Sequence, residues 1–223
     1  MRKSKAETAK TRERILEAAC AQFLTHGITE AGLARLMRAA GLTHGGFYRH
    51  FASKDQLVAE ACSHAVLSLT SGLKSQIEGK PPDQALPLLV GKYLSRSHRD
   101  QPATGCVLAA LGSELARADT KTREAATEGF LGLSRLIAGQ LKNVPAKKAE
   151  AQSMAIAAAL IGAMTISRIV PDPRISNSIL VGPGPLSLLP PRCPHAAPSS
   201  RASQSDPHSR SIACLGRGSP PPS

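Results

Sequence analysis

Hydrophobic residues recur with a helical period over about residues 1–170, and no segment in that range alternates as a strand would. The first amphipathic helix is expected at 8–26, where Ile15 and Phe23 lie on one face. The same periodicity predicts further helices at about 30–40, 43–50, 53–78, 83–98, 104–117, 120–142 and 147–169. The predicted fold class is therefore all-α.

The second and third predicted helices are separated by Gly41, a residue suited to the left-handed backbone that ends many helices. Thr43 is a candidate N-cap for the third helix. Ser53 and Gln56 have the spacing of a capping box, which marks the start of the fourth helix. Helix, Gly41 and helix form a helix-turn-helix pattern, in which the second helix enters the major groove of DNA.

The composition indicates a core of packed helices, and the net charge indicates a polyanionic binding partner. Hydrophobic residues make up 42% of the chain and aromatic residues only 3%, which favours helices over a β-sandwich. The formal net charge is +12, and residues 1–54 carry ten basic against four acidic residues. Such a charge attracts nucleic acid or an anionic membrane surface. Its concentration in the segment with the helix-turn-helix favours DNA.

The longest apolar run, Ala155–Ile166, is shorter than the roughly 20 residues needed to span a bilayer, so we interpret it as a buried helix. The charged N-terminus lacks the features of a signal peptide. Five cysteines without paired spacing indicate free thiols in a reducing cytosol. We therefore expect a cytoplasmic protein, nucleoid-associated when bound to DNA, with no membrane contact.

The last part of the chain has a different composition. Residues 181–223 contain ten Pro, nine Ser and four Gly, and the apolar periodicity ends there. Such a segment buries too little surface to offset its chain entropy, which predicts a disordered tail. The beginning of another helix at about 172–180 is followed directly by Gly and Pro residues, and a frameshift in the gene is one explanation for this change.

Residues 33–57 contain a more specific pattern: an Ala-Gly turn, a Thr cap, a Tyr-x-His-Phe core and a Ser-Lys-x-x-Leu opening of the fourth helix. This segment resembles the signature of the TetR family of bacterial transcriptional regulators, in the subset with Thr-His-Gly-Gly-Phe-Tyr-Arg-His-Phe. The resemblance is strong over 10–70 and weaker to about 180. Leu36-Met37 departs from the usual Ile-Ala but stays apolar.

The resemblance implies a helix-turn-helix DNA-binding domain at 1–54 with a recognition helix at about 43–50. It also implies a helical ligand-binding and dimerisation domain at 55–180. The protein would be a regulator, with repression expected, that binds a palindromic operator in double-stranded DNA as a homodimer. A small hydrophobic or electrophilic inducer would release it.

Phe47 and Phe51 are spaced to pack inward, which leaves polar neighbours available for DNA. A tyrosine hydroxyl, an imidazole and a lysine at a helix N-terminus all suit phosphate oxygens. The expected DNA-binding residues are Thr29, Arg38, Thr43, His44, Gly45, Tyr48, Arg49, His50 and Lys54. The Gly45-Gly46 pair destabilises a helix, so we expect either close approach to DNA or tight packing there.

The helix at 147–169 has an apolar stripe through Met154, Ala158, Ile161, Thr165 and Ile169, which fits either dimerisation or a subunit core. Expected inducer-binding residues lie on the helices before it and on this helix: Leu89, Tyr93, Cys106, Val107, Leu111 and Met164. No metal or cofactor is expected.

Cys106 precedes a predicted helix, a position that lowers a thiol pKa, so it is either an electrophile sensor or a small buried residue. An enzyme is the first alternative function, but the chain has none of the common catalytic motifs, and nothing in the sequence orients His98 toward Cys106. A second alternative is a degenerate DNA-binding protein that no longer regulates. Dimer formation would separate this alternative from a working repressor.

Overall fold

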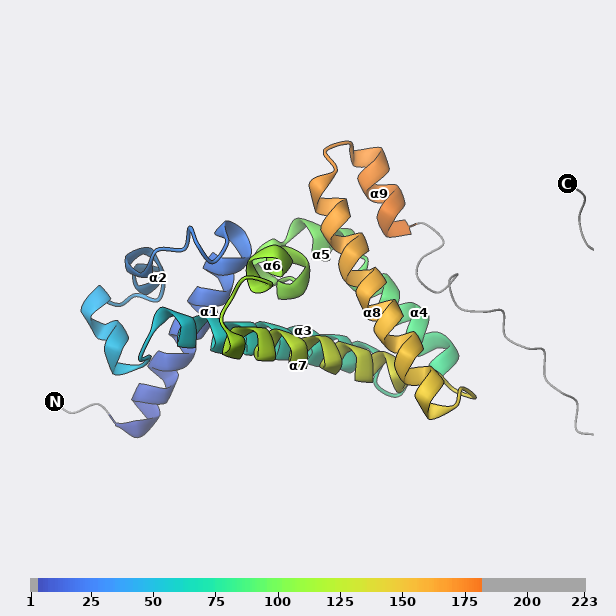
Figure 1. The fold of residues 1–223 in the computed structure, drawn as a ribbon, viewed down its shortest axis with the longest axis horizontal. Helices are drawn as coiled ribbons and strands as arrows, with labels where there is room; N and C mark the ends of the chain where they lie inside the picture. Colours follow the sequence, from blue (N-terminus) through green and yellow to red (C-terminus); the bar gives the residue numbers. More distant parts are fainter. Residues whose placement is uncertain (1–3, 182–223) are drawn as a thin grey trace, which may run out of the picture. The chain divides into compact units, whose positions relative to one another are not determined.

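The computed structural model describes residues 4–181, and every regular element among them is a helix. In chain order these are α1 Lys5–His26, α2 Leu33–Ala39, the 3-10 helix η1 His44–Arg49, α3 Lys54–Ile77, α4 Pro82–Tyr93, α5 Arg96–Asp100, the 3-10 helix η2 Pro102–Thr104, α6 Val107–Leu115, α7 Thr120–Ala138, α8 Ala146–Ile169 and α9 Pro173–Val181 (Figure 1). The predicted all-α fold is confirmed for this range. The predicted tail lies outside the described residues, apart from Val181 at the end of α9.

The long helices α3 and α7 lie side by side, and α3 connects α1, α2 and η1 with the remaining helices (Figure 1). Helix α8 packs on α7, and α9 folds back against α8. Helix α6 contacts α1 on one side and α8 on the other. It is therefore placed to link the N-terminal helices to the rest of the described chain.

Two hydrophobic clusters stabilise this arrangement. The first joins α1, α2, η1 and the start of α3, and it includes Ile15, Leu36, Phe47 and Leu57. It continues into α6 through Leu111, so it extends past residue 54, the expected end of the DNA-binding domain. The second joins the end of α3 with α4, α7, α8 and α9; its most buried members include Leu89, Tyr93, Ile137, Leu160 and Met164.

The helix ends follow the sequence signals closely. Gly27 and Gly41 end the first two helices with φ of +84° and +69°, a backbone region in which other residues are strained. Ser53 accepts a hydrogen bond from the Gln56 N–H at 3.1 Å, so the predicted cap is confirmed. The Gln56 side chain accepts from the N–H of Ala52 at 2.7 Å.

Two predicted helices differ from the structure. The one expected at 83–98 is two helices, α4 and α5, because the Ser95 hydroxyl caps a new first turn by accepting from the His98 N–H at 3.2 Å. The predicted recognition helix is a 3-10 helix, with Thr43 at its N-cap position but without the predicted hydroxyl cap. Gly45 and Gly46 supply weak helix propensity there, which is consistent with this short element.

Candidate functional site

The segment after Gly41 presents polar side chains on an aromatic base. Phe47 has 0% exposure, whereas its neighbour Tyr48 is 67% exposed. Phe47 stacks on Phe51 with ring centroids 5.7 Å apart, and the Arg12 guanidinium lies 4.5 Å from the centre of the Phe51 ring. The predicted inward packing of both phenylalanines is therefore confirmed, and it fixes the direction in which the rest of η1 faces.

Most of the predicted DNA-binding residues lie on one continuous stretch of chain. His50 is half-buried, as is Lys54 at the start of α3. The exposed members are Thr29, Arg38, Thr43, His44, Gly45, Tyr48 and Arg49. The sequence from Thr43 to Lys54 thus offers hydroxyl, imidazole, guanidinium and ammonium groups, which are the groups that proteins use on phosphates and base edges.

Neither glycine of η1 is required by packing. A Cβ added to Gly45 would have no atom of the described chain within 4 Å. At Gly46 it would lie 3.8 Å from the Met37 side chain, an ordinary van der Waals contact. The tight-packing explanation is therefore wrong for Gly45, and close approach to DNA stays a prediction for this residue.

We expect Gly45→Ala to weaken DNA binding about tenfold while leaving the free energy of unfolding unchanged or raised by up to about 1 kcal/mol. The added methyl group would occupy space that the DNA needs. Paired gel-shift and urea-unfolding measurements check this. Gly72→Ala is the control, since Gly72 is equally open but lies within α3. Unchanged DNA affinity in Gly45→Ala would contradict close approach at this residue.

A cluster of charged hydrogen bonds ties the loop between α1 and α2 to α3 and α6. Glu114, on α6, accepts from the N–H groups of Ile28 and Thr29 at 2.9 and 3.0 Å and from the Thr29 hydroxyl at 3.2 Å. The Lys54 ammonium donates to the Ile28 carbonyl at 2.8 Å. Thr29 and Lys54 thus have partners within the protein that the sequence did not predict.

Lys54→Ala should weaken binding to all DNA sequences alike and reduce the slope of log affinity against log salt by about 1, through loss of one phosphate contact. It should also cost about 1 kcal/mol of stability, because the bond to Ile28 is lost. Lys74→Ala, at the far end of the same helix, is the control. A change in base preference would instead identify Lys54 as a base-reading residue.

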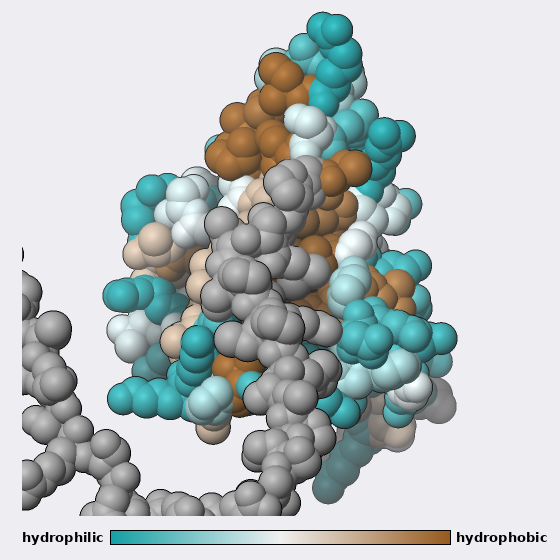
Figure 2. Space-filling view, turned by 90° about the vertical axis from the view of Figure 1, so that its right-hand side faces the viewer, coloured by the Kyte–Doolittle hydropathy of each residue, from teal (hydrophilic) through white to brown (hydrophobic). Residues whose placement is uncertain are grey.

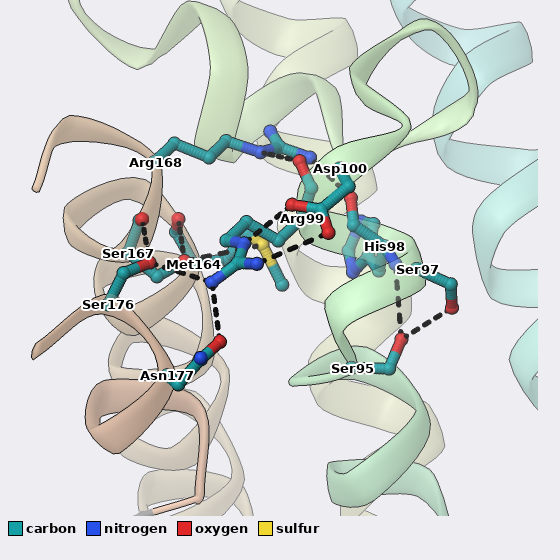
Figure 3. A network of polar contacts seen from close by, with 10 residues as sticks. All are labelled: Ser95, Ser97, His98, Arg99, Asp100, Met164, Ser167, Arg168, Ser176 and Asn177. Atoms are coloured by element: carbon teal, nitrogen blue, oxygen red, sulfur yellow. Dashed lines mark hydrogen bonds and ion pairs between the residues drawn. The ribbon is translucent and has the colours of Figure 1, made fainter. Parts of the chain in front are cut away.

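A second polar cluster surrounds His98, between α4, α6 and α8. Its Nδ1 donates to the Tyr93 carbonyl at 2.6 Å, and its Nε2 accepts from the Cys106 N–H at 3.0 Å. This pattern defines a neutral imidazole, and burial lowers the pKa of His98. Arg168 donates to the carbonyls of His98 and Arg99 at 2.8 and 3.2 Å (Figure 3).

Of the two alternatives for Cys106, the structure favours the small buried residue. Its thiol is buried at the N-cap position of α6, and burial raises its pKa despite the opposing effects of Tyr93, nearby backbone N–H groups and Arg168. The thiolate is the nucleophilic form, so a raised pKa makes the thiol less reactive. The sequence showed nothing that orients His98, but the structure fixes its ring by two hydrogen bonds to the backbone. Its Nε2 accepts from the backbone N–H of Cys106 and is not directed at the thiol.

The six predicted inducer-binding residues do not form one group. Leu89, Tyr93, Cys106 and Met164 belong to the second hydrophobic cluster, whereas Val107 and Leu111 belong to the first. All six are buried. An open groove of about 300 Å³ lies nearby between α6, α7 and α8; it is lined by Leu108, Ala126, Thr127, Phe130 and Ile161.

Sequence reasoning missed Glu114 and Arg168 entirely. Glu114 contacts Thr29 across 85 positions, and Arg168 contacts His98 across 70. Neither residue belongs to a recognisable motif, and no periodicity relates such distant positions. Only the packing of α6 and α8 brings them to their partners.

Comparison with known proteins supports two consecutive regions. Residues 15–61 match the model described as "Bacterial regulatory proteins, tetR family", and residues 82–174 match "Transcriptional regulator LmrA/YxaF-like, C-terminal domain". The "Probable acrEF/envCD operon repressor" of Escherichia coli K12 is 42% identical over 59 residues, which is 26% of this chain and 27% of that protein. The "HTH-type transcriptional repressor BepR" of Brucella suis is 46% identical over 54 residues, 24% of this chain and 26% of that one.

The chain thus matches only about a quarter of the length of these curated relatives. Solved structures extend the similarity in fold. A TetR-family regulator from Cytophaga hutchinsonii has a TM-score of 0.69 at 20% identity, covering 80% of this chain and 94% of that one. Another from Agrobacterium tumefaciens has a TM-score of 0.66 at 21% identity, covering 79% and 96%.

The two family models cover the helix-turn-helix with its aromatic base and nearly all of α4 to α8, in the order that the fold requires. The chain belongs to the TetR family of bacterial regulatory proteins.

Proposed function

We propose that this protein is a transcriptional repressor that binds a palindromic operator in duplex DNA as a homodimer and is released by a small molecule. The observation that carries the proposal is the segment from Thr43 to Lys54, whose polar groups face outward from a buried Phe47–Phe51 pair. This segment lies within residues 15–61, which match the tetR family model, and two curated relatives are named as repressors. We place the protein in the cytoplasm.

Within this segment we assign two kinds of contact. His44 and Arg49 are exposed along η1, where base edges are read, and the open backbone at Gly45 allows the close approach that such reading needs. Tyr48, His50 and Lys54 bind phosphate oxygens. Weaker phosphate contacts come from Arg38 and from Thr29, whose donors are also directed at Glu114.

The homodimer is proposed to form through α8 and α9. Their outer faces expose Ile166, Ile169, Ile175 and Val181, and Figure 2 shows hydrophobic residues gathered on the side of the molecule where these helices lie. By length and composition α8 could also cross a membrane, and 33% of its apolar window is buried inside the protein. We favour a subunit interface, because its inner face carries the buried Leu160 of the second hydrophobic cluster.

Release requires a ligand that prefers the state unable to bind DNA. The ligand-binding site is proposed among α4, α6 and α8. Helix α6 connects this region to the DNA-binding helices, because its Glu114 holds the backbone of Ile28 and Thr29. A ligand that shifts α6 would therefore shift these helices too. A reaction of an electrophile with Cys106 is not part of the proposal.

We propose no catalytic role for the chain. His98 has both ring nitrogens engaged with backbone groups, and the Cys106 thiol is buried with a raised pKa. These two residues were the enzyme candidates from sequence, and their geometry does not support proton transfer between them.

The test selects binding sites for the full chain from a randomised duplex library and measures the molecular mass of the protein by light scattering. The expected result is an enriched palindrome together with the mass of a dimer. Enrichment without symmetry, from a monomer, would contradict the dimeric repressor. An absence of any enriched sequence would overturn the proposed DNA-binding function itself.

A further inference from the structure

The Arg168 guanidinium lies within the protein without an acidic partner. Its Nε and Nη2 donate to backbone carbonyls of α5, and no carboxylate of residues 4–181 forms an ion pair with it (Figure 3). Its Nη1 atom is buried and has no hydrogen-bond partner in that range. The nearby Asp100 pairs with Arg99 instead. The Arg168 side chain is half-buried, and a buried donor of a cation is costly to leave unpaired unless an anion pairs with it.

A second unused group lies close by. Tyr93 has 0% exposure, and its hydroxyl has no oxygen or nitrogen partner among the described residues. Its polar neighbour is the Cys106 thiol, a weak hydrogen-bonding group. The Tyr93 ring packs edge-on against His98, with centroids 4.8 Å apart, and Arg168 donates to the His98 carbonyl. Tyr93 and Arg168, the two residues with an unused polar group, therefore both contact His98.

The surroundings favour an anion at this position. The N-terminus of α6 begins at Val107 beside the cluster, and its helix dipole is positive there. Gly105 lets the guanidinium pack closely at this position, because a Cβ would lie 2.7 Å from Arg168 Nη2. The His98 ring is neutral in this hydrogen-bonding pattern, so it does not balance the charge of Arg168.

We propose that Arg168 and Tyr93 form the recognition site for a monocarboxylate with an apolar body, which would be the releasing ligand if the proposed repressor function holds. The planar guanidinium matches the geometry of a carboxylate, and the phenol donates a further hydrogen bond to it. Buried Leu89 and Met164, in the same hydrophobic cluster, suit the apolar body. The cluster lies beside α5, a helix of five residues that is hydrogen-bonded to side chains of α8 and α9.

The experiment is calorimetric titration of the full chain with benzoate and hexanoate, each compared with its neutral isostere, benzamide or hexanamide. We expect both carboxylates to bind and both amides to bind at least about tenfold more weakly. Tyr93→Phe should weaken carboxylate binding about tenfold and Arg168→Gln by more. The control Arg174→Gln removes a cation that is 93% exposed on α9 and should change nothing.

Tyr93→Phe removes a single oxygen without a strong partner, so it keeps the fold and the test remains decisive even if Arg168→Gln does not fold. Equal binding of acids and amides, no binding of either acid, or unchanged affinity in Tyr93→Phe would each overturn the proposed site. Binding of the selected DNA is measured on the same preparation. DNA binding without carboxylate binding rejects only this site, whereas carboxylate binding without DNA binding rejects only the repressor function.

Discussion

Replacing Ile166 and Ile169 together by Glu is expected to convert the dimer to a monomer and to weaken operator binding by about 10²–10⁴-fold. Both side chains lie on the exposed apolar face of α8, and Ile169 is 66% exposed. A two-fold interface would bring four carboxylates together in an apolar contact, where desolvation and like-charge repulsion both oppose association. The operator loss follows because two linked recognition segments bind far more tightly than one.

The matched control is Leu67→Glu. Leu67 is 65% exposed on α3, so the substitution adds one carboxylate at an apolar residue as exposed as Ile169 and away from α8 and α9. It should leave both the mass and the operator affinity unchanged. Light scattering and gel shift measure the two quantities. A dimeric Ile166→Glu/Ile169→Glu variant would contradict the α8 interface, and a monomeric variant with full operator affinity would contradict the need for a dimer.

Alanine substitutions at the neighbouring residues Phe47 and Tyr48 should differ in their effect on stability. Phe47→Ala is expected to lower the free energy of unfolding by about 3–5 kcal/mol, because it removes a fully buried ring and leaves a cavity beside Phe51. DNA binding would be lost as a consequence of unfolding of the N-terminal helices. Urea unfolding followed by circular dichroism measures the change.

Tyr48→Ala should change stability by less than about 0.5 kcal/mol, since the Tyr48 ring is 67% exposed. Its DNA affinity should nevertheless fall for every sequence, because a phosphate contact is lost. A large loss of stability in Tyr48→Ala, with unchanged affinity per folded molecule, would make Tyr48 a structural residue. Comparable effects of the two substitutions would contradict the division between the aromatic base and the DNA-facing side.

The sequence predicted the N-terminal helices well because their signals are local. Gly41 can adopt the left-handed backbone that ends α2 without strain, and Ser53 caps a helix that follows it directly. Phe47 and Phe51 are four positions apart, so their common direction could be predicted from spacing alone. The 3-10 form of η1 was not predicted, because periodicity over so few residues does not distinguish two types of helix.

The second half was harder because its polar chemistry depends on contacts between distant residues. The helix break at Ser95 has a local cause, but the apolar pattern ends at Leu94, so no periodicity distinguishes the polar helix α5 from a continuation of α4. The position of Cys106 at a helix start was predicted correctly, but its pKa is dominated by burial, which depends on how α4 and α8 cover it. Likewise, the Glu114 and Arg168 contacts exist only once the helices are assembled.

The most direct test of the central claim is a hydroxyl-radical footprint of the full chain on a palindromic duplex selected by the protein. Two protected half-sites are expected on one face of the DNA, with centres about 34–36 Å apart, because two recognition segments related by a two-fold axis meet successive major grooves. Tyr48→Ala should weaken protection in both half-sites equally. Protection of a single half-site, or protection that Tyr48→Ala leaves unchanged, would contradict a dimer that binds DNA through Thr43 to Lys54.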